Sequence, residues 1–228
     1  MGGARGDQAV LDAVAGRRSI RRFLPTAVSD DVVLRILEAA SRAPSGQNMQ
    51  PWLVHFVTGE TRDRLSAAVI AAAQADERSD EYAYFPSQPI REPYLSRRRK
   101  VGYDLYALHG IDRNDFEGRK RVLLRNFEFF DAPVGLFFTM ERDWGYGAWI
   151  DLGMVMMNVM TAARAFGLET CPQQAWCEYG AAVRSVLGVP DHHVIVSGMA
   201  LGHADHGAFE NSLVTERAPP EDFVIRHR

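Results

Sequence analysis

The segment from Trp149 to Phe166 constrains the fold more than any other part of the sequence, because as a helix it is apolar on nearly every side. Leu152 and Val159 belong to a stripe at helical spacing, whereas Met157 lies on another face. Gly167 is typical of a residue that ends such a helix. Since the helix has no continuous polar face, it must be covered on several sides, either by a folded core or by a second subunit.

The composition is that of a globular protein able to build such a core. Of the 228 residues, 46% are hydrophobic and 24% are charged, which argues against disordered and collagen-like chains. The length suits a single domain over residues 1–228. The formal net charge of -3 gives no global reason to bind nucleic acid or an anionic membrane, so any basic function must be local.

Cysteine usage and hydropathy indicate where the protein works. Cys171 and Cys177 are the two cysteines, and a single pair cannot form a disulfide framework or a four-ligand zinc site. The first thirty residues lack an apolar signal core, and no uncharged apolar stretch approaches the roughly 20 residues that span a bilayer. The sequence therefore predicts a soluble protein of the cytoplasm.

Periodicity and helix-ending residues predict an α+β fold. Helices are expected from Ser29 until Pro44 stops the chain, and over 60–76, 115–130 and 178–187, with strands over 52–58, 134–140 and 193–201. Residues 79–99 contain three prolines and show poor periodicity, which predicts a long loop. We expect this loop to belong to a lid or excursion around 79–112 that carries function.

Several familiar constellations are absent. The glycines at 145, 147 and 153 do not form a dinucleotide fingerprint, because Ile150 stands where its third glycine belongs. His203 and His206 have a metal-like spacing but no convincing third ligand nearby, so no metal site is predicted. Cys171 has no local base motif, and a small buried thiol is the favoured interpretation over a nucleophile.

Two N-terminal segments have the chemistry of a binding site. Arg17–Arg22 (RRSIRR) groups guanidinium groups with a hydroxyl, a combination suited to a phosphate, although a solvated basic face is the common alternative. Ala43–Trp52 (APSGQNMQPW) presents polar side chains between two prolines that fix the backbone. Taken alone, the second segment is equally a stiff turn that leads into a strand.

Two later segments complete a recognisable pattern. They are Glu169–Trp176 (ETCPQQAW) and Gly198–Asp205 (GMALGHAD), the latter followed by Asn211 and Arg217. With these four segments, the sequence from Arg17 to Arg217 resembles the FMN-dependent nitroreductases. The stretches REPYLSRRRKVGYDLYALHGI and NFEFFDAPVGLFF resemble the nitrobenzoate-reductase-like branch of that family. His203 and Ala204 depart from the tyrosine and proline that often follow the glycine of the last segment.

The resemblance implies a nitroreductase-like fold, with a central mostly antiparallel sheet surrounded by helices, in an intertwined homodimer. Two FMN sites would lie at the subunit interface. By resemblance, the first arginines and serine hold the flavin phosphate, and Arg217 is a second anchor for that phosphate. Arg21 approaches the ring, and Pro44, Ser45 and Asn48 are supplied by the other subunit. The implied cofactor-binding residues are Arg17, Arg18, Ser19, Arg21, Pro44, Ser45, Asn48, Pro172, Gln173, Gln174, Gly202 and Arg217.

The function implied by the resemblance is hydride transfer from NAD(P)H through FMN to a nitroaromatic, such as a nitrobenzoate, or to a quinone. A ping-pong mechanism is expected, with no protein side chain as the catalytic group, because the flavin carries the chemistry. A flavin-dependent reductive dehalogenase, another reductase of this fold and a non-catalytic FMN-binding module are the alternatives.

The segment Arg91–Lys100 (REPYLSRRRK) holds five positive residues in ten. It is either a solvated basic surface or a lid, and these two interpretations are evenly balanced. In the lid hypothesis Tyr94 shields the flavin, and Arg97, Arg98 or Arg99 attracts a negatively charged acceptor. These four are the candidate substrate-binding residues.

Overall fold

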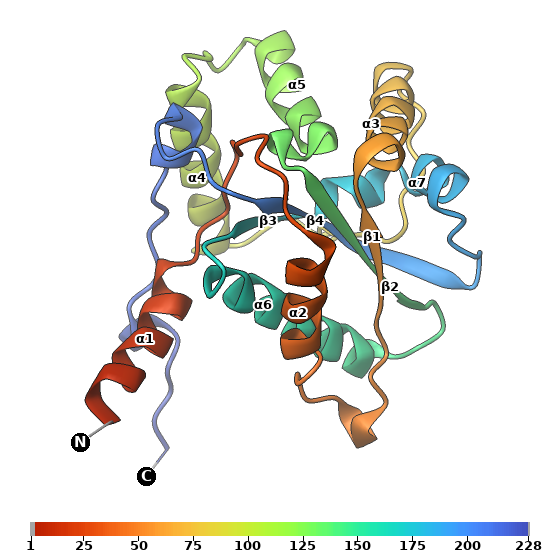
Figure 1. Ribbon diagram of the computed structural model, residues 1–228. Coiled ribbons are helices and arrows are strands. Elements are labelled where there is room, and N and C mark those ends of the chain that lie inside the picture. The colour runs from red at the N-terminus through yellow and green to blue at the C-terminus, as the bar shows by residue number, and fades with distance from the viewer. Residues whose placement is uncertain (1–2, 228) are drawn as a thin grey trace.

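The computed structural model describes residues 3–227, and the side chains from residue 8 onward. Its centre is a four-stranded antiparallel sheet in the order β1–β2–β4–β3 (Figure 1). The strands are β1 (Leu53–Val57), β2 (Val134–Glu141), β3 (Glu169–Gln173) and β4 (His193–Gly202). The predicted α+β fold with a mostly antiparallel sheet is confirmed.

Seven α-helices are described around this sheet. They are α1 (Gly3–Gly16), α2 (Asp30–Ala40), α3 (Gly59–Gln74), α4 (Tyr94–Leu108), α5 (Phe116–Leu124), α6 (Tyr146–Arg164) and α7 (Gly180–Leu187). Short 3-10 helices follow α2, α5 and β3, at Gly46–Asn48, Arg125–Asp131 and Gln174–Glu178. Two more, Phe209–Ser212 and Pro220–Asp222, lie in the C-terminal segment.

The two inner strands are buried on both faces. All ten residues of β4 are buried, as are the first seven of β2. This is why both strands read as continuous apolar runs instead of alternating with polar residues. Successive side chains of β2 serve opposite faces of the sheet, with Phe137 in one core and Phe138 in the other.

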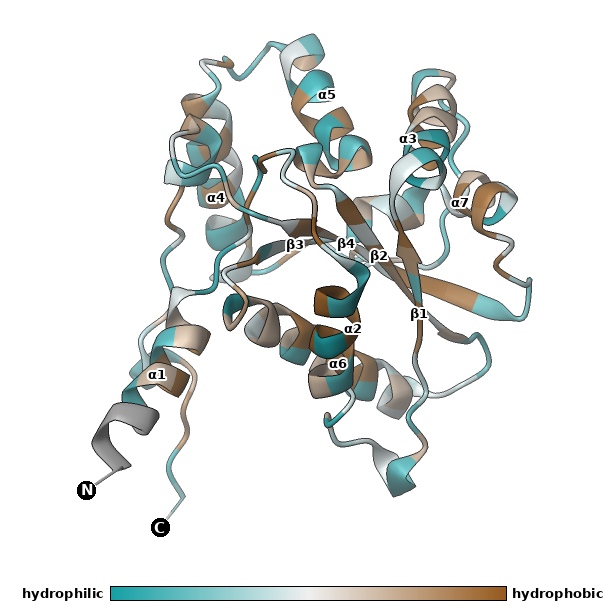
Figure 2. Cartoon of the chain, in the orientation of Figure 1, coloured by the Kyte–Doolittle hydropathy of each residue, from teal (hydrophilic) through white to brown (hydrophobic). Residues whose placement is uncertain are grey.

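Each face of the sheet has its own hydrophobic core. Val33 and Ile36 of α2 and Leu152 and Val159 of α6 cover one face. The opposite core contains Leu65 of α3 together with residues of α7 and of the two 3-10 helices that follow α5 and β3. Figure 2 shows the brown, hydrophobic inner strands between these layers. The sheet is therefore the middle layer of the molecule.

The predicted elements agree with the structure where local signals are strong, and two assignments need correction. The loop predicted over 79–99 is wrong for residues 94–99, because α4 begins at Tyr94 and these residues are helical. The predicted helix 115–130 ends at Leu124 and continues as a 3-10 helix, in which Phe129 and Phe130 have positive φ. These two rings are buried, so core packing overrides the helical periodicity.

Helix α6 is only partly covered by its own chain. Leu152 and Val159 are buried, whereas Tyr146 and Ile150 near its start are 89% and 65% exposed. The chain's own core thus covers the side of α6 that faces the sheet, but it leaves the apolar residues at the start of the helix exposed. Among the described residues, no helix is both long and apolar enough to cross a membrane.

Close packing makes Gly198 of β4 a sensitive position. A Cβ added there would lie 2.4 Å from Cδ1 of the fully buried Trp176, whose ring is enclosed by Phe127, Phe129 and Phe137. Because this aromatic cluster leaves the indole little room, Gly198→Ala is expected to lower the free energy of unfolding by about 1–3 kcal/mol. Urea denaturation followed by tryptophan fluorescence measures this change.

Gly102→Ala is the matched control, because nothing lies within 4 Å of its added Cβ and the residue is in the middle of α4. It should leave stability unchanged or raise it by up to about 1 kcal/mol. A Gly198→Ala variant as stable as this control would contradict the packing argument.

Candidate functional site

The basic segment 17–22 lies along the edge of the sheet, beside β3. Ser19 forms a parallel bridge with Thr170, and the Ile20 amide donates to the Thr170 carbonyl at 3.1 Å. Ile20 and Phe23 are buried and anchor the segment, while Arg17 and Arg21 remain partly exposed. The apolar residues thus fix the backbone, and the guanidinium groups stay available to a ligand.

The end of β4 holds the same segment from the other side. The Leu24 amide donates to the His203 carbonyl at 2.8 Å, and the Asp205 amide donates to the Arg22 carbonyl at 3.0 Å. Gly202 lies against Pro133 and Phe23, and an added Cβ would be 2.8 Å from Cδ of Pro133. The chain therefore turns after β4 through His203 and Ala204, and this turn holds the basic segment.

Asn211 is a positioning residue that the motif analysis did not assign to the site. Its buried side chain accepts from the Arg21 amide at 2.7 Å and donates to the carbonyls of Arg22, at 2.7 Å, and Asp205, at 2.9 Å. The three bonds lock the basic segment to the C-terminal region. Nothing local in the sequence marks a single asparagine for this role, because two of its three partners, Arg21 and Arg22, lie about 190 residues away in the chain.

Two arginines near the site are engaged in structural ion pairs. Arg22 is 2.7 Å from Asp131, which also binds Arg125 at 2.6 Å. Arg164 of α6 contacts Glu169 and donates to the Gly16 carbonyl, which fixes the end of α1 just before the basic segment. Arg22 is therefore neutralised within the protein, whereas no ion pair of Arg17 or Arg21 is found among the described residues.

Three buried polar atoms beside the basic segment lack hydrogen-bond partners within the described part of the chain. They are Nε of Arg17, Oγ1 of Thr170 and Oε1 of Gln173. The other end of the Gln173 amide donates to the Asn126 carbonyl at 2.6 Å, so its side chain is already oriented. Buried groups without partners are costly, and their concentration here is typical of a site that binds a polar ligand.

Cys171 is a structural residue, as predicted. The thiol is buried and free, and burial raises its pKa to about 11. The nearby Arg21, Ser19 and Arg17 oppose this shift only in part. Because the reactive form of cysteine is the thiolate, this thiol is not a nucleophile at neutral pH.

The turn with Pro44, Ser45 and Asn48 lies elsewhere in the same chain. Figure 1 places it beside the start of β1 and the beginning of α6, away from β3. The Gly46 amide donates to Oδ2 of Asp151 at 3.0 Å, and the Ser45 hydroxyl accepts from the Gln50 amide at 2.9 Å. A hollow of about 490 Å³ separates this turn from the loop before α6. One chain therefore does not join this turn to the basic segment.

The remaining predicted residues divide between two regions. Pro172 and Gln174 follow the bridge to Ser19, with Pro172 partly buried and Gln174 exposed. Arg217 is exposed, donates to Thr215 and Glu216, and lines one hollow with Arg97. The structure thus brings a predicted phosphate ligand next to a predicted substrate ligand.

Helix α4 presents the other basic residues at the surface. Arg98 lies over the Phe85 ring at 4.2 Å, and Arg97 is 5.9 Å from the Tyr94 ring and 3.7 Å from Asp222. Arg99 lines a separate hollow with Tyr103. The positive charge is therefore held on an ordered helix and is partly balanced by the C-terminal segment.

Comparison with known proteins decides the family. The family model for nitroreductases matches residues 14–203. This chain belongs to the nitroreductase family. The match contains the basic segment, the 43–52 turn, β3 and the start of the turn after β4. Three of the four segments on which the resemblance was recognised lie inside it, and the fourth, Gly198–Asp205, lies inside it up to residue 203.

The relatives include named nitroaromatic reductases. The chain is 40% identical over 211 residues to 4-nitrobenzoate reductase of Pseudomonas putida, covering 92% of both chains. It is also 40% identical over 215 residues to nitrobenzene nitroreductase of Ectopseudomonas oleovorans, covering 93% of this chain and 94% of the relative.

Solved structures share the fold of this family member over nearly its whole length. The FMN- and NADPH-dependent nitroreductase NfnB of Sphigopyxis sp. strain HMH has a TM-score of 0.93 and 38% identity, covering 96% of this chain and 99% of the other. The FMN-dependent NfnB of Mycobacterium smegmatis, solved with NADPH, has a TM-score of 0.93 at 28% identity, covering 97% and 99%. The predicted nitroreductase-like fold is confirmed.

Proposed function

We propose that this protein is an FMN-dependent oxidoreductase of the cytoplasm that passes hydride from NAD(P)H to a nitroaromatic or quinone acceptor. The observation that carries the proposal is the basic segment along β3, where Arg17 and Arg21 form no ion pair with the described residues and buried polar atoms lie beside them. The named activities of the relatives that span more than nine-tenths of the chain support the same reaction class.

The residues present fit FMN. Arg17 and Ser19 offer charged and neutral donors to a phosphate, and Nε of Arg17 is a buried donor without a partner among the described residues. When bound, FMN supplies two-electron redox chemistry that no side chain of this protein provides. The thiol of Cys171 is not required for that chemistry, because its raised pKa keeps it protonated.

The protein's own groups bind and orient the reactants. Arg21 supplies a fixed positive charge, which favours the reduced, more negatively charged form of the cofactor over the oxidised form. Asn211 holds the Arg21 backbone in place through the hydrogen bonds described above. Pro172, Gln173 and Gln174 would line the redox-active edge of the ring, where a backbone amide suffices as a donor.

A homodimer completes this proposal. Pro44, Ser45 and Asn48 lie away from the basic segment of their own chain, so they join such a site only when a second copy supplies them. The same region exposes apolar side chains of Met49, Tyr146 and Ile150. A two-fold interface over the start of α6 would bury these side chains and bring both halves of each site together.

The proposed function predicts a shared position for donor and acceptor. The purified protein should be yellow, bleach on addition of NADH or NADPH, and recover its colour with a nitroaromatic or quinone. Steady-state rates should give parallel double-reciprocal lines, because the nicotinamide leaves before the acceptor binds. Intersecting lines together with a ternary complex would rule out this order, and failure to bleach would rule out the enzyme.

Arg17→Ala should weaken FMN binding by about 1.5–3 kcal/mol, because it removes a charge-assisted contact to the phosphate. Arg217→Ala tests the second anchor separately, since Arg217 lies with Arg97 and not in the basic segment. Arg64→Ala on α3 is a matched exposed control and should leave affinity unchanged. Fluorescence titration of the apoprotein measures all three, and wild-type affinity in Arg17→Ala would remove this residue from the site.

Sedimentation velocity should show a species of about twice the 25.5 kDa chain mass with bound flavin. Ile150→Asp should shift the protein toward monomer and release FMN, because a charge would be buried in the interface. Phe116→Asp on α5, another exposed apolar position, is the control. An FMN-saturated monomer at nanomolar concentration is incompatible with the shared site.

Neutralising Arg97, Arg98 and Arg99 together to glutamine should lower kcat/KM for 4-nitrobenzoate more than for uncharged nitrobenzene. The physical reason is the loss of attraction to a carboxylate, and added salt should reduce the difference. FMN affinity should stay unchanged. Stopped-flow reoxidation of the reduced protein by each acceptor measures the selectivity.

A charge-matched control separates this effect from a change in net charge. Arg64, Lys120 and Arg226 are exposed cations outside α4. Their triple glutamine variant should retain the wild-type ratio of the two acceptors. If the α4 variant loses kcat/KM equally for both acceptors, the segment Arg91–Lys100 is a solvated basic surface and does not select the acceptor.

A further inference from the structure

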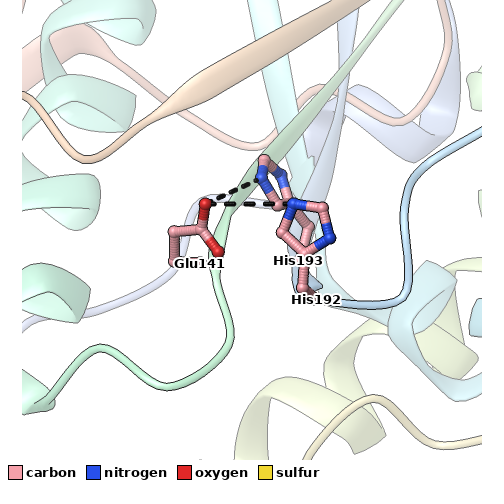
Figure 3. Close-up of side chains that lie close together, drawn as sticks. All are labelled: Glu141, His192 and His193. Atoms are coloured by element: carbon pink, nitrogen blue, oxygen red, sulfur yellow. Dashed lines mark ion pairs between the residues drawn. The ribbon is translucent and has the colours of Figure 1, made fainter.

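A cluster of two histidines and a glutamate lies at the opposite end of β4 from the Gly202 turn and the basic segment. Glu141 ends β2 and pairs with His193, the first residue of β4, and His192 immediately precedes it (Figure 3). Gly202 is at the other end of β4, on the order of 30 Å away along the strand. The cluster is therefore far from Gly202 and from the turn after β4 that holds the basic segment.

Three potential metal ligands converge there. Nε2 of His193 is 3.5 Å and Nε2 of His192 is 3.9 Å from Oε1 of Glu141, and the ligand atoms all lie within 4.8 Å of one another. Neighbouring ligand atoms around a tetrahedral zinc ion are about 3.3 Å apart, given bonds of about 2.0–2.1 Å. His192 is exposed, so a small side-chain rotation would close the remaining gap.

The central ligand is buried and already oriented. His193 is 7% exposed, and its carbonyl accepts from Arg184 at 2.8 Å and from Arg142 at 3.0 Å. Its Nδ1 is 3.4 Å from Oγ1 of Thr139. Its Nε2 points toward Glu141 at a distance longer than the roughly 2.7–3.2 Å of a normal hydrogen bond.

Thr139 links this ring to a third histidine. Oγ1 of Thr139 is 3.2 Å from Nε2 of His55, so the hydroxyl can donate to His55 while it accepts from Nδ1 of His193. In that arrangement Nε2 of His193 carries a free lone pair directed at the position between the three ligands. A histidine that binds a metal through one ring nitrogen usually donates a hydrogen bond from the other, and the Thr139 hydroxyl would be the acceptor here.

The neighbouring cation does not occupy the cluster. Arg142 follows Glu141 in the chain, but its guanidinium is directed to the buried Glu81 at 2.8 Å. The two imidazole rings lie edge to face with centroids 4.7 Å apart, so both ring nitrogens can approach the Glu141 carboxylate together. One divalent cation would satisfy both rings and the carboxylate without adding a proton.

We propose that Glu141, His192 and His193 bind a late first-row divalent cation, with Zn²⁺ as the ion that suits two imidazoles and one carboxylate. The ion would join the end of β2 to the start of β4 and thereby stabilise the folded chain. Its position between the ends of two paired strands gives it a structural role. The pair His203 and His206, with its metal-like spacing, does not belong to this cluster.

The test is calorimetric titration of ZnCl₂ into the full-length protein, as purified with its flavin and then dialysed against EDTA. One ion should bind per chain, and the melting temperature should rise on saturation because the ligand binds the native state. His192→Ala and Glu141→Gln should each weaken binding at least about tenfold. Both side chains are partly or fully exposed, so these variants should fold.

His206→Ala is the matched control, since this histidine is exposed and outside the cluster. It should bind Zn²⁺ like the wild type. The proposal is overturned if the wild-type protein takes up no ion at micromolar ZnCl₂, or if His192→Ala and Glu141→Gln bind as tightly as the control. A loss confined to His206→Ala would place an adventitious ion at another surface histidine.

Discussion

Pairing of β2 with β4 is the interaction on which the rest of the structure depends. Both strands are buried on two faces, so their backbone groups can be satisfied only by each other and by the flanking strands. Trp176 fills the space over Gly198 at the middle of β4 and joins the aromatic core to the sheet. The rigidity of β4 in turn fixes what lies at its two ends: the Gly202 turn at one and His193 at the other.

The candidate flavin site is built on the sheet edge that this pairing leaves open. β3 pairs with β4 on one side, and its other side receives the basic segment through Thr170. Ile20 and Phe23 are buried, and Asn211 forms hydrogen bonds with the backbone of the segment. These contacts hold the backbone in place without involving the arginine side chains. Asp131 forms an ion pair with Arg22, whereas Arg17 and Arg21 form none with the described residues and stay available to a ligand. The division explains how one short motif can serve both folding and binding.

The arginines of α4 lie at the surface, unlike the basic segment beside β3. The helix has no buried residue, and its arginines are held by aromatic rings and by acidic groups of the C-terminal segment. Such exposed contacts contribute little stability, and salt screens them. Arg97 of this helix and Arg217 of the C-terminal segment line a common hollow at the surface. Substitutions on this helix are therefore expected to leave the sheet and the basic segment undisturbed.

The sequence by itself determined the elements with strong local signals and the residues with distinctive chemistry. The apolar runs of β2 and β4, the helix ending before Gly167 and the four family segments were all recognisable, because hydrophobic periodicity and turn residues act over a few positions. Two features became visible only in the folded chain: Asn211 holds the basic segment in place, and Glu141 meets His192 and His193. Each of these depends on contacts between residues far apart in the chain, and such contacts leave no period or spacing in the sequence.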